Sequence, residues 1–67
     1  MNLLKFNNKR IELIDIYGNK YVGMAYYEDA DTAYDSEDSL TIRTFHNGYE
    51  EYCGVFESEI KFIKILD

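Results

Sequence analysis

Cysteine and proline are nearly absent from this chain of 67 residues, which has one Cys and neither Pro nor Trp. The single thiol, Cys53, cannot form an internal disulfide, so the chain is not a secreted scaffold held together by disulfides. No stretch comes near the ~20 consecutive apolar residues that span a membrane. The start of the chain also lacks the apolar run of a secretory signal. We therefore expect a cytoplasmic protein without a membrane segment.

Basic residues are scarce in the middle of the chain. Between Lys20 and Lys61 there are ten acids and one base, Arg43, and the whole chain carries a formal charge of −6. Affinity for nucleic acid depends mainly on Lys and Arg side chains that neutralise phosphates, and attraction to an anionic membrane depends on the same residues. The charge therefore disfavours nucleic acid and membranes as partners and favours a basic protein.

The chain nevertheless has the residues of a folded domain. Hydrophobic residues make up 46% of it, and they include seven Tyr and four Phe. Disordered segments lack this aromatic and branched content. A domain of this size buries only about 60% of the surface of its unfolded chain, so little remains to build and support a deep cleft. We expect a single domain, residues 1–67, that is not an enzyme and holds no cofactor.

Alternating apolar and polar residues predict five β-strands. In residues 39–45, Leu40 and Ile42 alternate with Thr41 and Arg43. The turn pairs Gly18-Asn19 and Asn47-Gly48 tolerate the positive φ that tight hairpins need. The predicted strands are residues 9–17, 20–27, 38–45, 49–55 and 60–66.

Two residues break the simple strand pattern. Asp15 falls in the inward phase of the first strand, so either both faces are covered there or a bulge shifts the register. Gly23 lies inside the second strand, where a glycine often marks a bend or a close backbone approach. Outside the strands, we expect a short helical turn or a lead-in strand in residues 1–8 and a tight turn at residues 57–59.

Five short strands joined by tight turns predict an all-β fold, a small five-stranded barrel of the SH3-like or Sm-like kind that can begin with a short N-terminal helical turn. Closing the sheet suits a short chain, because closure limits exposed strand edges. An edge left open would let the chain pair with a neighbour, so a homo-oligomer is compatible with the sequence. A helix packed on a sheet and another type of small barrel are the alternatives.

The order of short motifs resembles the Sm-like (Lsm) family. The matching residues are Ile11-x-Leu13, Gly18-x-x-Tyr21-x-Gly23, and the turn at Glu57 that leads to Ile60. More closely, the chain resembles small Sm-like proteins of Gram-positive bacteria and their mobile elements, such as phages, over about residues 9–66. The resemblance implies an Sm-like barrel, and members of that family typically form rings that bind uridine-rich RNA.

The chain departs from the family at the residues that would bind RNA. The family's pocket uses an Asp and an Asn after the second strand, and these positions fall here in the acidic stretch 28–38. It also uses an Arg-Gly pair before the last strand, whereas Gly54 here follows Cys53 and has no Arg nearby. We therefore do not transfer RNA binding to this chain, and an Sm-like RNA-binding ring stays an alternative.

The residues of catalytic and metal sites are present only singly. In the acidic stretch 28–38, Ala33 and Tyr34 occupy the positions where a calcium loop needs an acid and a glycine. His46 is the only histidine, and a catalytic base or zinc site needs partners. Cys53 lies in a predicted strand, where a small buried hydrophobe is expected. We predict no catalytic residue and no bound metal.

The most informative feature is tyrosine set among acids. The stretch 28–38 holds six acids and no base, although clustered like charge repels itself and folding does not require it. One explanation for the clustered acids is that they keep the protein soluble. The other is an interface, because Tyr combines contact area, rigidity and a polar tip. The predicted partner-binding residues are Tyr26, Tyr27, Asp29, Asp31, Tyr34, Asp35 and Asp38.

These residues predict a protein-interaction module that binds a basic protein partner through an acidic, Tyr-rich surface. An acidic mimic of nucleic acid is the main alternative. Such a mimic would occupy the basic groove of an enzyme that binds DNA or RNA, as some small phage proteins do.

Overall fold

Five antiparallel strands form one sheet in the computed structural model, which describes residues 1–66 apart from the side chains of Ala33 and His46. The strands are β1 (Lys9–Asp15), β2 (Lys20–Glu28), β3 (Ser39–His46), β4 (Tyr49–Phe56) and β5 (Ile60–Ile65). Short helical turns flank them: η1 (Leu3–Phe6), α1 (Ala30–Ala33) and η2 (Glu57–Glu59). The all-β prediction is confirmed, and the strand bounds agree closely with the predicted ranges.

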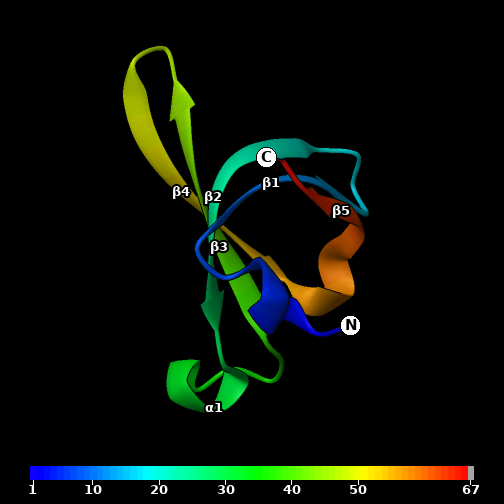
Figure 1. Ribbon diagram of the computed structural model, residues 1–67. Coiled ribbons are helices and arrows are strands. Elements are labelled where there is room, and N and C mark those ends of the chain that lie inside the picture. Colours follow the sequence, from blue (N-terminus) through cyan, green and yellow to red (C-terminus); the bar gives the residue numbers. More distant parts are fainter. Residues whose placement is uncertain (67) are drawn as a thin grey trace.

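The sheet is open. Its strand order is β4-β3-β2-β1-β5, so β4 and β5 are the two edges and form no ladder with each other in the part of the chain that the structure describes. Figure 1 shows β2 as a long curved strand that joins the β3–β4 hairpin to the β1–β5 pair. The closed barrel that we predicted is therefore not confirmed, because the ladder that would close it is missing.

Gly23 marks the point where β2 leaves β3. The ladder between these strands ends at the pair Met24 and Arg43, whereas β2 continues beside β1 as far as Lys20. A methyl group at Gly23 would overlap the backbone carbonyl oxygen of Arg43, so the close backbone approach predicted there is confirmed. Beyond Arg43 the β3–β4 hairpin stands away from the rest of the sheet (Figure 1).

One hydrophobic core lies on the inner face of the sheet. It consists of Leu3, Phe6, Ile11, Leu13, Ala25, Leu40, Ile42 and Val55. Two of these residues come from η1, so the N-terminal turn covers part of the inner face. Asn2 begins that turn by accepting a hydrogen bond from the Leu4 N–H at 3.1 Å. Tyr21 and Tyr27 pack against the core, which means that most of the tyrosines are left for the surface.

Asp15 ends β1 and is a buried residue, only 4% exposed. Its Oδ1 accepts from the backbone N–H groups of Tyr17 at 3.0 Å and Asn19 at 2.8 Å, and its Oδ2 accepts from Asn19 Nδ2 at 3.1 Å and from the Tyr21 hydroxyl at 3.0 Å. Burial acts to raise the pKa of Asp15, but these hydrogen bonds outweigh it and hold the pKa below its usual value. Pairing with β5 shifts between Ile14 and Asp15, so of the two alternatives expected at Asp15 the shift in register is the one observed.

The helical turns are short. The regions predicted to turn at residues 1–8 and 57–59 both form single 3₁₀ turns, and the acidic stretch 28–38 contains the one turn of α1. Over residues 1–66, the structure has no helix whose length and apolar character would let it cross a membrane.

Candidate functional site

Asp38 ties the acidic stretch to the sheet. Its Oδ2 accepts a hydrogen bond from the Tyr27 hydroxyl at 3.0 Å, and its Oδ1 accepts one from the Ala30 N–H at 2.9 Å. The hydrogen bond to Asp38, assisted by burial and by the charge of the carboxylate, raises the pKa of Tyr27 above its usual value. Two of the predicted site residues therefore hold the loop in place.

Asp29 and Tyr34 define the two ends of α1. Asp29 Oδ1 accepts from the Asp31 N–H at 2.7 Å and caps the first turn. Tyr34 ends the turn with φ 57°, a left-handed conformation that is uncommon outside glycine. Its side chain is 96% exposed. The backbone thus fixes Tyr34 at the tip of the loop, with its ring in solvent.

An open groove of about 570 Å³ lies beside this loop on the outer face of the sheet. We call it the tyrosine groove, and its lining residues are Tyr26, Tyr27, Glu28, Asp29, Thr32, Thr41 and Tyr52. Strand register explains how residues far apart in sequence meet here. Tyr26 pairs with Thr41, and Tyr52 pairs with Arg43, two residues along β3. Paired residues share a face of an antiparallel sheet, so these side chains all lie outside.

The tyrosine groove offers aromatic rings and carboxylates, and none of its lining residues is basic. Tyr26 is half-buried, while Tyr52 is 62% exposed and donates its hydroxyl to Glu50 Oε1 at 3.2 Å. A Lys or Arg within about 6 Å of an aromatic ring is attracted by the ring's quadrupole. The carboxylates of Glu28 and Asp29 add ordinary charge attraction. The groove is therefore chemically suited to basic side chains.

The structure brings some predicted site residues together and separates others. Those that line the tyrosine groove are Tyr26, Tyr27 and Asp29. Asp35 lines a smaller neighbouring depression of about 200 Å³, together with Glu28. Asp31 and Tyr34 are exposed and line neither depression. Asp38 is occupied by its hydrogen bonds within the fold.

Tyr52 and Glu28 line the groove but were not among the predicted site residues. A signal for Tyr52 existed in the sequence. The Asn47-Gly48 turn pairs His46 with Tyr49, and counting outward from that pair places Tyr52 opposite Arg43. Arg43 lies on the outer face because its neighbour Ile42 points inward, and paired residues share a face, so Tyr52 also lies on the outer face.

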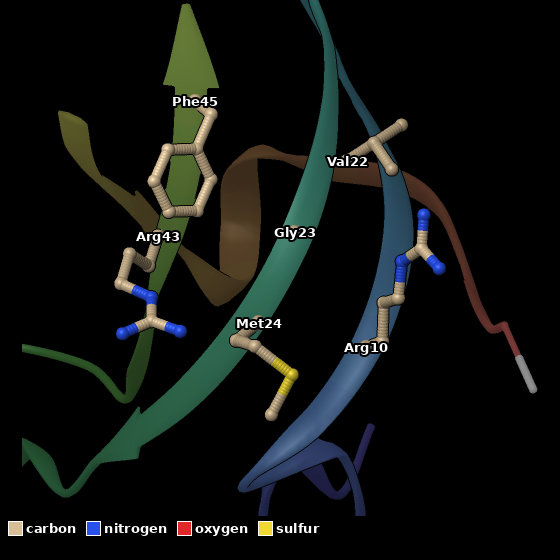
Figure 2. Close-up of a pocket in the computed structure, with 6 residues that line it drawn as sticks. All are labelled: Arg10, Val22, Gly23, Met24, Arg43 and Phe45. Atoms are coloured by element: carbon tan, nitrogen blue, oxygen red, sulfur yellow. The ribbon is translucent and has the colours of Figure 1, made fainter. Parts of the chain in front are cut away.

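A second groove, of about 480 Å³, lies where β2 leaves β3 (Figure 2). We call it the arginine groove, and its lining residues are Arg10, Val22, Gly23, Met24, Arg43 and Phe45. Met24 pairs with Arg10 on one side and with Arg43 on the other, and Figure 2 shows the two arginines flanking it. Arg43 Nε lies 3.4 Å from Glu50 Oε1. Within residues 1–66, Arg10 forms no ion pair.

The structure also bears on the residues considered for catalysis and metal binding. Across residues 1–66, without the side chains of Ala33 and His46, no three His, Cys, Asp or Glu side chains are grouped to hold a metal ion. The side chain of His46 lies outside what the structure describes, so its expected lack of a catalytic role stays a prediction. Cys53, where a small buried hydrophobe was expected, is half-buried. It pairs with Ile42 near the place where the hairpin leaves the sheet.

The chain matches no protein-family model, no curated protein and no solved structure, so its function has to be argued from the geometry of these two grooves.

Proposed function

We propose that this protein is a non-enzymatic interaction module that binds a basic segment of a partner protein in the tyrosine groove. The observation that supports this function is the lining itself, in which Tyr26 and Tyr52 accompany Glu28 and Asp29 without any basic residue. The bond between Tyr27 and Asp38 holds the rim of the groove before a partner arrives. Such preorganisation lowers the entropy that binding has to overcome.

Each cation–aromatic contact in the tyrosine groove is weak, and this determines how many basic residues the partner must have. A cation over an exposed aromatic ring contributes about 0.5–1 kcal/mol, so one basic residue cannot supply a stable complex. We therefore expect a partner segment with several Lys or Arg residues. One would lie between Tyr26 and Tyr52, and others would face the exposed acids Asp31 and Asp35. Charges at the rim of an interface mainly speed association and make it depend on salt.

The partner can be found by capture from the native host. Wild-type protein and a Tyr26→Ala/Tyr52→Ala variant serve as paired baits, and mass spectrometry identifies what each retains. We expect a basic protein that only the wild type retains. If the two baits retain the same proteins, the groove is not the binding surface.

Association kinetics with that partner then test the acids. The variant E28Q/D31N/D35N changes three carboxylates for which the described structure shows no hydrogen bond, in contrast to Asp29 and Asp38, which hold the backbone. The expected result is slower association with a weaker dependence on salt. An unchanged rate and salt dependence would mean that the acidic stretch is only a solvated surface.

A competition experiment separates this function from the nucleic-acid mimic. A mimic occupies its partner's nucleic-acid groove, so DNA or RNA would displace it. An ordinary interaction module binds elsewhere, and nucleic acid would leave the complex intact. The acidic tyrosine groove gives no support to the third possibility, an RNA-binding ring, because phosphates need basic contacts.

We also infer that the sheet is of the SH3-like or Sm-like barrel type. The last strand, β5, returns to pair with β1, so only the gap between the β4 and β5 edges separates the sheet from a closed barrel. The cytoplasm remains the compartment that we propose.

A further inference from the structure

The outer face of β2 and β3 carries opposite charges at its two ends. Val22, Met24, Tyr26 and Glu28 follow one another along this face of β2, since alternate residues of a strand point the same way. The arginine groove lies at the Met24 end, and none of its lining residues is acidic. The tyrosine groove lies at the Glu28 end, and none of its lining residues is basic. The face is therefore polarised along the strand.

The two ends are far enough apart to keep their charges separate. Met24 and Glu28 are four residues apart on β2, which at ~3.3 Å per residue is about 13 Å. That distance exceeds the Debye length of about 8 Å at physiological salt. Of the other charges near the positive end, Glu12 is paired with Lys20 at 3.4 Å and Glu50 with Arg43 at 3.4 Å. Of the two arginines that line the arginine groove, Arg10 is the one that forms no ion pair within residues 1–66.

Apolar side chains on this face are exposed to water. Val22 is 40% exposed, Phe45 70% and Tyr52 62%, while Met24 and Tyr26 are half-buried. Contiguous apolar surface on a small domain usually marks a contact with another macromolecule. Covering these side chains would add hydrophobic stabilisation to any charge pairing.

A polarised face is complementary to itself after a half turn, because the rotation brings each positive end to a negative end. The midpoint between Met24 and Glu28 is Tyr26. We propose that this face docks on the same face of a second copy about a two-fold axis near Tyr26, so that Arg10 of each subunit lies against Glu28 of the other. The contact joins faces and leaves the β4 and β5 edges unused.

The expected complex is a weak dimer. The whole chain exposes 4620 Å², and a standard interface of roughly 800 Å² per partner would take about a sixth of it, more than the ~10% usual for a small protein. The contact should therefore fall at the small end of specific interfaces, with a Kd in the micromolar range or above. It involves no other protein, so it does not rest on the proposed function. It does cover the tyrosine groove, so a basic partner and the second copy would compete.

Sedimentation equilibrium of the full chain, from micromolar to millimolar concentration and at low and high salt, tests the dimer. We expect a monomer–dimer equilibrium that salt weakens. The single charge reversals R10E and E28K provide the sharper test. In a dimer of R10E both contacts set two carboxylates against each other, and in a dimer of E28K both set two cations together. Each variant alone should dimerise at least tenfold more weakly than the wild type.

An equal mixture of R10E and E28K should restore the dimer, because both contacts between the two variants join opposite charges. K9E is the matched control, since Lys9 is exposed but pairs with the inward residue Ala25 and so lies on the other face. It should dimerise as the wild type does, and thermal melts confirm that each variant folds. The proposal is wrong if the wild type stays monomeric at millimolar concentration, if the mixture restores nothing, or if assemblies grow beyond the dimer.

Discussion

The hydroxyl of Tyr21 donates a hydrogen bond to Asp15 Oδ2 at 3.0 Å, across the turn that joins β1 to β2. This bond raises the pKa of Tyr21, with burial acting in the same direction, and it is one of the bonds that lower the pKa of Asp15. A carboxylate that lies inward at the end of a strand is costly unless its oxygens are satisfied. Here four donors satisfy it, so the inward acid organises the first hairpin.

The stability that Asp15 contributes should depend on pH. Its pKa in the folded protein lies below the unfolded value of about 3.9, so the contribution is present above that value and is lost as pH falls through the folded pKa. Urea unfolding between pH 2 and pH 7 should show D15N to be less stable than the wild type at neutral pH, with the gap closing toward pH 2. D31N, at an exposed acid, should follow the wild type throughout. If the difference in unfolding free energy between D15N and the wild type were the same at every pH, the charge of Asp15 would make no contribution to stability.

Gly23→Ala should destabilise the fold, because its methyl group would overlap the carbonyl oxygen of Arg43. Overpacking of this kind costs roughly 1–3 kcal/mol. Gly54→Ala is the matched control, since a methyl group there has nothing within 4 Å and lies in an ordinary strand conformation. Its effect should be neutral or slightly stabilising. Equal losses in the two variants, measured by urea unfolding, would contradict the close approach of β2 and β3.

Tyr27→Phe should loosen the acidic stretch without unfolding the domain. The ring stays against the core, while the hydroxyl bond to Asp38 is lost. Hydrogen exchange should then quicken at the Ala30 amide, which donates to the same carboxylate, and stay unchanged at the core strand β1. Tyr26→Phe is the control, because the described structure gives the Tyr26 hydroxyl no hydrogen-bond partner. Slow exchange at Ala30 in both variants would mean that Asp38 holds the loop without Tyr27.

The sequence predicts well what is decided over a few residues. Alternation gave the strands, and Asn47-Gly48 set the register of the β3–β4 hairpin. The inward Asp15 and the strand glycine Gly23 each flagged a real irregularity. In all of these cases the pattern that gives the signal lies within one strand or turn, although the contacts that explain Gly23 and the shift at Asp15 come from β3 and β5.

Long-range contacts account for what the sequence could not predict. Whether β4 meets β5 depends on the bend of the whole sheet, and the sheet is open. The acids of the stretch 28–38 look equivalent in sequence. In the structure Asp38 accepts a hydrogen bond from Tyr27, 11 residues away, and Asp29 caps the helical turn α1. Only some of the acids are therefore available to a partner. Composition cannot separate these roles, because they depend on which side chains the fold brings near.

The last prediction concerns which tyrosine anchors the partner. Tyr34 is the more exposed ring, but it stands at the tip of the loop and lines neither depression, whereas Tyr52 lines the tyrosine groove. Anchors are residues that become buried in a pocket on binding. Tyr52→Ala should therefore raise the dissociation rate of the captured partner by about tenfold, a cost of ~1.4 kcal/mol. Tyr34→Ala should change that rate less than about twofold. The opposite ranking in surface plasmon resonance would move the binding surface from the groove to the loop tip.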